Sequence, residues 1–585
     1  MTLFAVIPLM AQTRSVSGTV TSSSDGLPLP GVVVTVESNS SLYAITDVDG
    51  RYTVASVGDN DVLVFTMMGF STQNEPVSGR NAIDVVLVEE ATALEETVVI
   101  GYGTVKKKDL TGSVSSVNGD KLKETIATNV DQMLQGKVAG VQITQNSGAP
   151  GAASSIRVRG ANSINNTNEP LYIVDGVPFS GAGNTIGGFA WSGGSDGQNV
   201  VNPLSTIAPS DIVSIDILKD ASATAIYGAN GANGVIIITT KRGSAGKVNI
   251  TYDGYVTAQM ITNQLDMMNL REYAEYQQKL CAELNLSVNE AFKDPSLLGK
   301  GTNWQDEIFR TAWMHSHSVS VTGGTDKIRV AASGGYTDQD GVIIGSDFTR
   351  FNARLNLDAD IYPWLHAGAS LAFTHTDETI TNNDGTDGVV LQALTMQPNI
   401  PVYDFDGNWA GPESVNGASQ YNPVWLAQMK TNDFKRNRTM GNFYLSADPV
   451  KGLNIRTEYG FDYSDNNNRC FIPTYSFGTL ISSDTNQIMQ REEHSMYWIW
   501  KTYANYNKTW NGKHNFGAML GWEMTKSSWN GSQIVKKGLS SDIVQIVTQD
   551  GEFVSNSGWK DGSAMASAFA RVNYNYDEKY YVTAT

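Results

Sequence analysis

From about residue 247 onward, apolar and polar side chains alternate along the sequence with a period of two. In RFNARLNLDAD, residues 350–360, every second side chain is apolar and the side chains between them are Arg, Asn or Asp. GLNIRTEYGFDY, residues 452–463, repeats this pattern. Each run has about ten residues, the length that a tilted strand needs to cross a bilayer, and the bulky charged face suits a wet lumen. The period therefore predicts strands of a transmembrane antiparallel β-barrel over residues 247–585.

The lengths of the connections between these runs point the same way. Short turns such as GGTDK, DIYPW, DPVKG and WNGKH alternate with long polar loops at about residues 261–314, 376–436, 466–493 and 525–561. An outer-membrane barrel sorts its loops in this way, whereas a soluble β-sandwich, the alternative, would not. About eleven strands are expected, the first near residues 248–256, and a bilayer does not tolerate open sheet edges. We therefore expect the first half of a barrel, with the chain truncated inside the strand YYVTAT.

Composition excludes several classes of protein. The 585 residues carry a formal net charge of -18, which argues against binding of nucleic acid. No window approaches the roughly 18 apolar residues of a membrane-spanning helix. The two cysteines, Cys281 and Cys470, are too few for a disulfide framework, and the sequence does not say whether they pair. The start, MTLFAVIPLMAQ, predicts a signal-peptide remnant over residues 1–11, with a buried first strand as the alternative.

Residues 14–90 consist of short strand signals separated by turns, with no helical period, which predicts a small β-sandwich. Within it, DVDG at residues 47–50 could form half of a calcium loop. An EF-hand needs further ligands and a closing Glu, so a tight hairpin turn is the stronger interpretation. The segment resembles the carboxypeptidase-regulatory-like domain, a non-catalytic module.

A connector over residues 95–105 separates this sandwich from the next domain. Its β-prone patch, Thr97, Val98, Val99 and Ile100 followed by Gly101, lies between acidic residues and three lysines. A segment of this kind cannot bury a core of its own, but it can add as a strand to the sheet edge of another protein. We therefore predict that these five residues bind a partner.

Residues 106–243 mix helix and strand signals, which predicts one α+β domain with a Gly/Ser/Asn-rich insertion at residues 180–202. Its last part, KDASATAIYGANGANGVIIITTK, carries three glycines spaced by three. Phosphate-binding loops place a strand before the glycines and a helix after them, and here the order is reversed. A helix over Ala221–Tyr227, a glycine turn and a strand over Val235–Thr240 are expected.

No catalytic, metal or cofactor site is predicted. GGSDG at residues 193–197 fits G-x-S-x-G formally but lacks the flanking strand and helix of a nucleophile elbow. His315 and His317 share one strand face, and no third ligand is visible nearby. Four aromatic residues of one long loop are candidate ligand contacts, since aromatic rings can stack on sugars: Tyr403, Phe405, Trp409 and Tyr421. Other tryptophans fit an interfacial girdle in predicted strands: Trp364, Trp498, Trp500 and Trp522.

The chain resembles the SusC/RagA family of TonB-linked outer-membrane proteins. The resemblance rests on VVIGYGTVKKKDLTGSVSSV, LYIVDGVP and LKDASATAIYGANGANGVIIITTKRG, together with GTNWQDEIFR and HSVSVTGG. It implies a mainly β fold with a sandwich, an α+β plug and a barrel that the family completes with about 22 strands. The plug and the sandwich would lie on the periplasmic side of the outer membrane.

The resemblance also implies a function without an enzyme activity or a cofactor. TonB would pair with the segment from Thr97 to Gly101 and pull the plug. The expected role is import of nutrient oligomers, oligosaccharides first, together with a SusD-like surface lipoprotein. The alternatives are import of peptides, a binding or signalling receptor without significant uptake, and a surface hydrolase, for which the sequence shows no site.

Overall fold

The computed structural model describes most of the chain. The described residues are 14–23, 26–67, 70–88, 97–100, 103–106, 113–125, 129–145, 147–152, 154–164, 168–179, 203–383, 388–412, 420–478 and 480–585. Two compact units are present, residues 1–97 with 106–108 and residues 98–105 with 109–585. No described helix is both long and apolar enough to cross a bilayer.

The first unit is the expected two-layer sandwich. One sheet has the order β4 (Arg51–Val57), β1 (Arg14–Ser22), β7 (Val85–Leu87). The other has the order β3 (Asn39–Ile45), β2 (Val33–Val36), β5 (Val62–Thr66), β6 (Gln73–Pro76). Alternate residues of these strands fill one core, in which the Tyr52 hydroxyl donates to the Ile83 carbonyl at 2.8 Å.

The DVDG stretch makes the turn between β3 and β4, two strands that belong to different sheets. The Asp47 carboxylate accepts the backbone N–H groups of Asp49 at 3.0 Å and Arg51 at 2.8 Å. Gly50 has a φ of 70°, which glycine adopts without steric cost. The Asp47 side chain is therefore used within its own turn.

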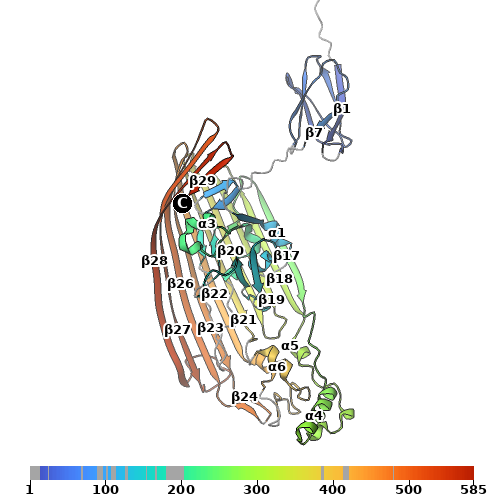
Figure 1. Cartoon of the computed structure of the whole chain (residues 1–585), viewed down its shortest axis with the longest axis vertical. Coiled ribbons are helices and arrows are strands. Elements are labelled where there is room, and N and C mark those ends of the chain that lie inside the picture. The colour runs from blue at the N-terminus through green and yellow to red at the C-terminus, as the bar shows by residue number, and fades with distance from the viewer. Residues whose placement is uncertain are drawn as a thin grey trace, which may run out of the picture. The chain divides into compact units, whose positions relative to one another are not determined.

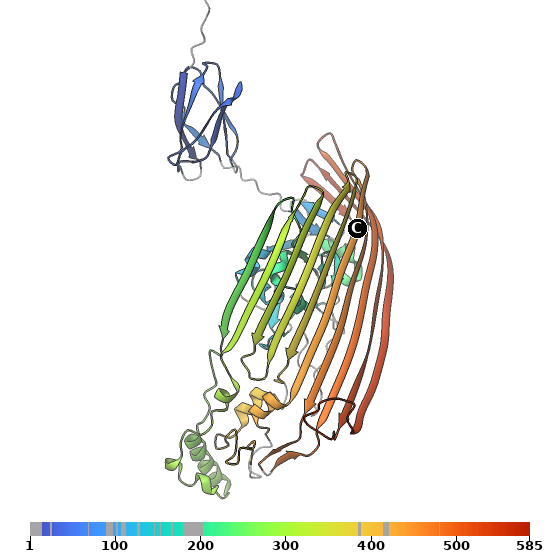
Figure 2. The ribbon, with the colours of Figure 1, turned by 180° about the vertical axis from the view of Figure 1, so that it is seen from behind.

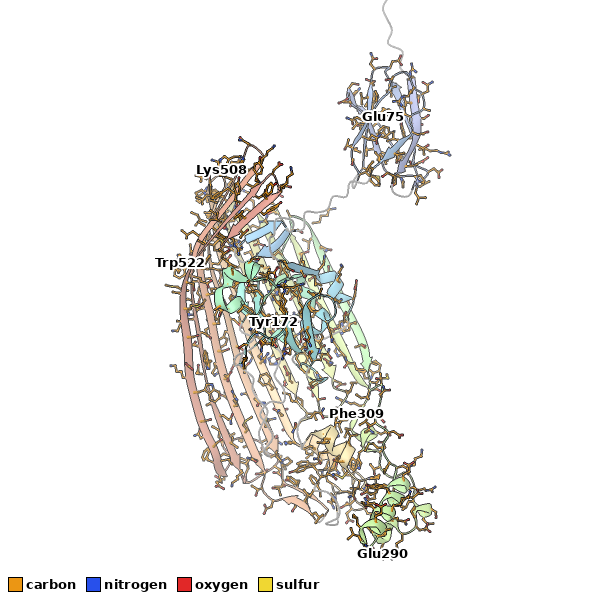
Figure 3. All side chains as sticks on the ribbon, viewed as in Figure 1. Glu75, Tyr172, Glu290, Phe309, Lys508 and Trp522 are labelled. Carbon is orange, nitrogen blue, oxygen red and sulfur yellow. The ribbon has the colours of Figure 1, made fainter. Side chains whose placement is uncertain are left out.

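The α+β domain has a five-stranded sheet in the order β10-β15-β16-β13-β14. Its strands are β10 (Val114–Asn118), β15 (Ile212–Leu218), β16 (Val235–Thr240), β13 (Leu171–Val174) and β14 (Val177–Phe179). A hairpin of β11 (Val141–Gln145) and β12 (Ser154–Val158) and the short helices α1 (Gly119–Lys123) and α2 (Val130–Leu134) complete the domain around one apolar core. Tyr172 lies in this core (Figure 3).

The glycine-rich motif of this domain folds as the sequence predicts. Helix α3 (Ala221–Thr224) continues into a 3-10 segment, η4 (Ala225–Gly231), which is interrupted at Gly228 with a φ of 57°. Gly234, with a φ of 91°, then leads directly into β16. The motif is thus a turn from helix to strand at the end of the domain.

The rest of the second unit is a curved antiparallel sheet of eleven consecutively paired strands (Figures 1 and 2). In order they are β17 (Gly246–Gln259), β18 (Ala312–Gly324), β19 (Ile328–Asp340), β20 (Asp347–Tyr362), β21 (Leu365–Thr379), β22 (Thr431–Val450), β23 (Leu453–Ile472), β26 (Gln487–Trp510), β27 (His514–Lys537), β28 (Glu552–Tyr576) and β29 (Tyr580–Ala584). Figure 1 shows the α+β domain on the concave face of this sheet.

The faces of the strands follow the predicted alternation. In β20 the polar side chains of Arg350, Asn352 and Asn356 are buried, whereas Phe351 and Leu355 are exposed on the outer face. Trp522 likewise lies on the outer side of β27 (Figure 3). The sheet thus buries its polar side chains against the α+β domain and exposes its apolar ones, as a lipid-facing wall does.

The connections alternate in length, with one correction. Residues 260–311 contain α4 (Leu270–Leu284) and α5 (Trp304–Ile308), and residues 380–430 contain α6 (Val389–Thr395) and α7 (Pro423–Met429). The other two predicted long loops are wrong in extent, because β23, β26, β27 and β28 continue into them and leave connections at 473–486 and 538–551. Short β24 (Tyr475–Phe477) pairs there with β25 (Ile481–Ser483). These strand ends resembled loops in composition because their polar side chains lie on both faces, with Glu492 and Lys526 on the exposed outer face. Both cysteines are free.

Candidate functional site: the α+β domain on the concave face

A tight hairpin of the α+β domain contacts the concave face of the eleven-stranded sheet, and we call this sheet the wall. Strands β13 and β14 are joined by Asp175 and Gly176, with φ values of 47° and 87°. An Asp-Gly pair suits a two-residue hairpin because both residues must adopt positive φ. The turn is held from within its own domain, since the Asp175 carboxylate accepts the Thr240 N–H at 3.0 Å and the Thr240 hydroxyl at 2.7 Å.

Charged side chains of the wall meet this turn in a buried setting. The Arg354 guanidinium of β20 lies 3.1 Å from the Asp175 carboxylate and 3.5 Å from that of Asp211, and all three side chains are buried. The Asn442 amide of β22 donates to the Asp175 carbonyl at 2.9 Å. A buried ion pair stabilises only when hydrogen bonds satisfy its remaining groups, and the two carboxylates around one guanidinium meet this condition in part.

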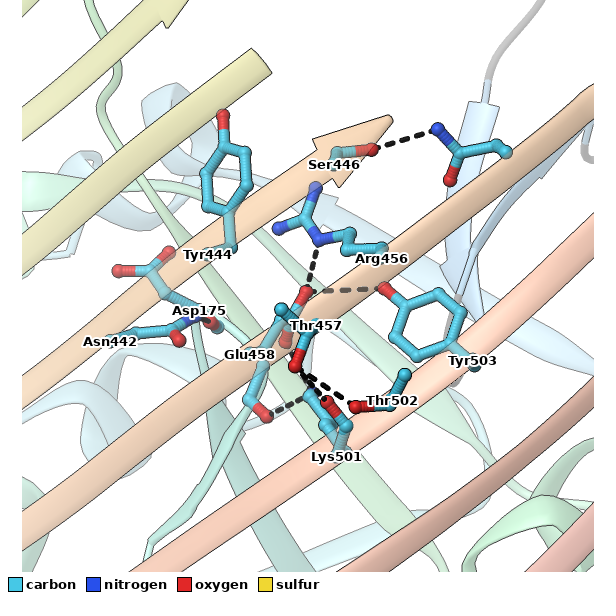
Figure 4. Close-up of polar contacts among 12 residues, drawn as sticks. Asp175, Asn442, Tyr444, Ser446, Arg456, Thr457, Glu458, Lys501, Thr502 and Tyr503 are labelled. Atoms are coloured by element: carbon cyan, nitrogen blue, oxygen red, sulfur yellow. Dashed lines mark hydrogen bonds and ion pairs between the residues drawn. The ribbon is translucent and has the colours of Figure 1, made fainter. Parts of the chain in front are cut away.

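Lys501 of β26 makes the contact on the other side of the turn. Its ammonium donates to the Gly176 carbonyl at 2.8 Å and pairs with the Glu458 carboxylate of β23 at 2.7 Å. Glu458 also accepts the Tyr503 hydroxyl at 3.1 Å and binds Arg456 (Figure 4). The Glu458 carboxylate therefore fixes the Lys501 ammonium in place, and this ammonium binds the Gly176 carbonyl of the α+β domain.

Two further groups of hydrogen bonds hold the domain. Near the end of β16, Arg242 pairs with Asp358 at 2.8 Å, and Asn356 donates to the Lys241 carbonyl at 2.5 Å. The second group reaches residues 205–210: Arg350 donates to the Ser205 carbonyl at 2.9 Å, Thr374 to the Thr206 carbonyl at 2.8 Å and Ser318 to the Ser210 hydroxyl at 3.0 Å.

Most of these bonds join a wall side chain to a polar group of the domain that water could serve equally well. Apolar contacts also join the two, at Val177 against Gly460, at Ile226 against Tyr503, and where Met440 and Ala372 pack with the core of the domain. A neutral hydrogen bond exchanged with water contributes about 0.5–1.5 kcal/mol net and one from a charged group about 1.5–3 kcal/mol, so each contact adds a modest increment to the free energy that holds the domain.

The predicted strand-addition segment is a strand. Residues Thr97–Ile100 form β8, which pairs with β9 (Gly103–Lys106) in a two-stranded sheet. Gly101 lies outside the described residues. After residue 113 the chain enters the α+β domain at β10, an edge strand, where the Asp220 carboxylate accepts the Ser113 N–H at 2.6 Å. Binding of a partner by residues 97–101 stays a prediction.

The four predicted ligand-contact aromatics lie in one loop region but not in one site. The rings of Tyr403 and Trp409 are 4.6 Å apart across a β-bridge, and Phe405 is fully exposed at the tip between them. The Asp404 carboxylate accepts backbone N–H groups of this tip, which lowers its pKa.

Tyr421 is half-buried at a different place, where its ring packs edge-on against Tyr475 and Phe477. Trp409 and Tyr421 both pack against the apolar cluster of the loops. Of the four aromatics, Tyr403 lines a cavity of about 1660 Å³ beside α5. A ligand role for all four remains a prediction.

The remaining sequence candidates are the two histidines and the GGSDG stretch. The His315 and His317 rings lie 5.4 Å apart, and His317 pairs with the Tyr252 hydroxyl at 2.7 Å. Within the described residues no group of three or more His, Cys, Asp or Glu side chains could hold a metal ion. GGSDG lies outside the described residues.

Sequence reasoning missed the wall side chains that contact the Asp175–Gly176 turn. The turn itself lies in LYIVDGVP, one of the stretches that carry the family resemblance. Its partners Arg354, Asn442 and Lys501 carry no local signal, because each is one polar residue among many on an alternating strand.

The comparisons with known proteins agree with this arrangement. Residues 16–99 match the CarboxypepD_reg-like domain family and residues 106–235 match the TonB-dependent Receptor Plug Domain family. TonB-dependent receptor P3 of Formosa agariphila is 34% identical over 98% of this chain and 54% of its own length. TonB-dependent receptor SusC of Bacteroides thetaiotaomicron is 32% identical over 100% of this chain and 57% of its own length.

The chain belongs to the SusC/RagA family of TonB-dependent receptors. Among solved structures, the RagAB peptide importer in its open-open state superposes with a TM-score of 0.70 at 26% identity, over 83% of this chain and 55% of that one. Members of this family are outer-membrane barrel receptors, so the α+β domain is the plug and the eleven-stranded sheet is barrel wall. This SusC/RagA chain spans about half the length of the curated relatives it matches.

Proposed function

We propose that this receptor imports nutrient oligomers across the outer membrane, driven by TonB. The observation that carries the proposal is the plug on the concave wall, held mainly by separate hydrogen bonds and ion pairs between side chains of the wall and groups of the plug. A gate needs a closed state of modest stability, and a contact of this kind has one. Such a gate must be opened by a force applied from outside, because nothing in the described residues resembles a nucleotide site.

The segment from Thr97 to Gly101 is the proposed point of attachment for TonB. An extended, β-prone segment can bind by strand addition, in which backbone hydrogen bonds supply the affinity. It precedes β10, an edge strand of the plug sheet that pairs with β15. Pulling from this side loads β10 first, at the Ser113 N–H bond to Asp220 and the Lys219 N–H bond to the Ser113 carbonyl at 3.2 Å.

The proposal includes a partner, an orientation and a substrate class. A SusD-like surface lipoprotein would cover the end of the barrel that carries α4 to α7, and the sandwich and the plug would face the periplasm. Oligosaccharides are the expected cargo. Peptides are the second candidate, because the related RagAB is a peptide importer. A receptor that binds ligand without uptake is the alternative function.

Val98→Pro tests the import step, since proline removes a backbone donor and breaks strand addition. Val98→Thr is the matched control, because it keeps the N–H group and a β-branched side chain. We expect the proline variant to bind ligand at the cell surface but to lose uptake, and the threonine variant to retain both. Wild-type uptake by the proline variant would refute the TonB assignment, and binding without uptake in the wild type would support the receptor alternative.

A further inference from the structure

The two outer faces of the N-terminal sandwich differ in polarity. The face of the β4-β1-β7 sheet is lined mainly by Ser and Thr side chains of β1 and by Arg51 and Thr53 of β4. The face of the β3-β2-β5-β6 sheet is largely apolar. Its outward side chains, which alternate with core residues, include Val33, Tyr43, Ile45, Val62 and Val64. Contiguous exposed apolar faces mark interaction sites on soluble domains.

The most exposed part of this apolar face lies on strand β3. Tyr43 is 62% exposed and Ile45 is 58% exposed. The pairing of β3 with β2 places Ile45 beside Val33 and Tyr43 beside Thr35, so the exposed side chains continue inward onto the sheet. A chain that lies along β3 can therefore contact apolar surface over the length of the strand.

Strand β3 is also an unprotected sheet edge. It pairs with β2 alone, and its backbone makes no hydrogen bond to any other element in the part of the chain that the structure describes. Proteins commonly blunt an edge strand with a charged residue, a proline or a short length. The other edge of this sheet, β6, carries Glu75 and Pro76, whereas β3 has seven residues, NSSLYAI, without either device. Its free edge can therefore accept a further strand.

The surroundings of this edge are acidic. Residues 14–90 contain ten Asp and Glu residues and three Arg, which gives a formal net charge of -7. Two of the three arginines are already held in ion pairs with acidic residues of the sandwich. Exposed carboxylates flank β3, with Glu37 before it and Asp49 in the turn after it, and neither has an ion-pair partner among the described residues.

This charge selects between the possible occupants of the edge. A second copy of the chain would bring another sandwich of charge -7 against the first, and like charges that face each other oppose association. A segment with basic residues at its ends would instead meet Glu37 and Asp49. The free backbone groups of the edge strand require that this segment be extended.

We propose that β3 binds an extended segment of a periplasmic protein by strand addition, and that this segment has β-branched residues in its middle and Lys or Arg at its ends. The middle of the segment pairs with the β3 backbone, its apolar side chains lie beside Tyr43 and Ile45, and its cationic ends pair with Glu37 and Asp49. The proposal rests on the proposed orientation of the receptor for the compartment of the partner. The contact is separate from the proposed attachment of TonB at residues 97–101.

The test is calorimetric titration of the purified receptor with synthetic heptapeptides, which needs neither TonB nor uptake. The probe is KTVTVTK, and its acidic counterpart is ETVTVTE. We expect the basic peptide to bind and the acidic one not to bind. Two forms of the basic peptide, N-methylated at one or the other alternate set of residues, test the backbone pairing. One form should lose binding because its N–H groups face β3, and the other should keep it.

The double variant Tyr43→Ser with Ile45→Ser tests the apolar face. It should bind KTVTVTK about ten-fold more weakly, because the cross-strand side-chain contacts are lost. The matched control is Val86→Ser with Val88→Ser, which removes two side chains that are 53% and 56% exposed on and beside β7, in the opposite sheet. It should bind the peptide as the wild type does.

The double variant Glu37→Gln with Asp49→Asn tests the charge. Its affinity for KTVTVTK should lose most of its dependence on salt, whereas the Tyr43 and Ile45 double variant should keep that dependence. The control, Glu275→Gln with Glu283→Gln, removes the same charge from exposed positions of α4 and should behave as the wild type.

Equal binding of the acidic and basic peptides, equal binding of the two methylated forms, or wild-type affinity in the Tyr43 and Ile45 double variant would overturn the proposal. Dimers in sedimentation that Tyr43→Lys dissociates would assign β3 to a second copy and overturn it as well. Uptake is measured separately, with Val98→Pro as its reference. A failed titration alongside uptake that depends on Val98 refutes the β3 contact alone, and peptide binding by a wild type without uptake supports the contact and refutes import.

Discussion

Substitution of Lys501 by Met should loosen the plug without unfolding the wall. The change removes the ammonium that donates to the Gly176 carbonyl and keeps the length and the apolar stem of the side chain. Glu458 retains Arg456 and Tyr503 as partners, so its carboxylate is not left alone. The loss therefore falls mainly on the seated state of the plug, because only that state contains the bond to Gly176.

The size of the effect follows from the burial of the contact. Lys501 and Glu458 have side chains that are 6% and 5% exposed. A hydrogen bond from a charged group contributes about 1.5–3 kcal/mol, which corresponds to a roughly ten- to hundred-fold change in the equilibrium for plug release. Lys435 of β22 is the matched control: it pairs with Asp377 at 2.7 Å, but the two side chains are 55% and 35% exposed. Its replacement by Met should cost about 0–1 kcal/mol.

Hydrogen–deuterium exchange of the purified receptor measures this difference. In Lys501→Met we expect faster exchange at the hairpin amides between Leu171 and Phe179 and unchanged exchange in β26. Lys435→Met should leave the hairpin as protected as in the wild type. Equal protection of the hairpin in the wild type and in Lys501→Met would show that this contact does not hold the plug, and the reasoning would be wrong.

Three further outcomes are expected. Burial raises the pKa of Glu169 in the plug above 4.5. Protonated Glu169 therefore stabilises the folded state at low pH, and this stabilisation is lost as the pH rises through the folded-state pKa. Glu169→Gln should make the unfolding temperature less dependent on pH across this range. A Cβ at Gly460 would lie 2.6 Å from Val177, so Gly460→Ala should raise the protease sensitivity of the plug, whereas Gly334→Ala, where space is open, should not. Residues 14–90 expressed alone should unfold cooperatively because their core is self-contained, and a disordered circular-dichroism spectrum would contradict this.

Much of the fold could be read from local patterns. The period of two over residues 350–360 identified both the strand and its faces, because successive side chains of an extended chain must point to opposite sides. The hairpin at Asp175–Gly176 has a similarly local cause, the need for positive φ at both positions. The order of helix, glycine turn and strand after Asp220 could also be predicted, since the residues that begin and end a helix act over only a few positions.

Prediction from local composition failed where the same residue type occurs in two different environments. The polar stretches around residues 466–493 and 525–561 were expected to be loops, but β23, β26, β27 and β28 extend into both with polar side chains on the outer as well as the inner face. Trp409 and Tyr421 pack partly against the apolar cluster of the loops, and their ligand role stays a prediction. An aromatic ring or an asparagine is compatible with either setting, and only its neighbours in space decide between them.

The plug contacts were determined by tertiary structure alone. Arg354 reaches Asp175 across 179 residues of sequence, and Lys501 reaches Gly176 across 325. Each wall residue is one polar position on a strand that presents several, and no local rule selects it. The register of the eleven paired strands and the position of the plug against them decide which wall residue makes each contact. A hydrogen bond depends on where two atoms lie in space.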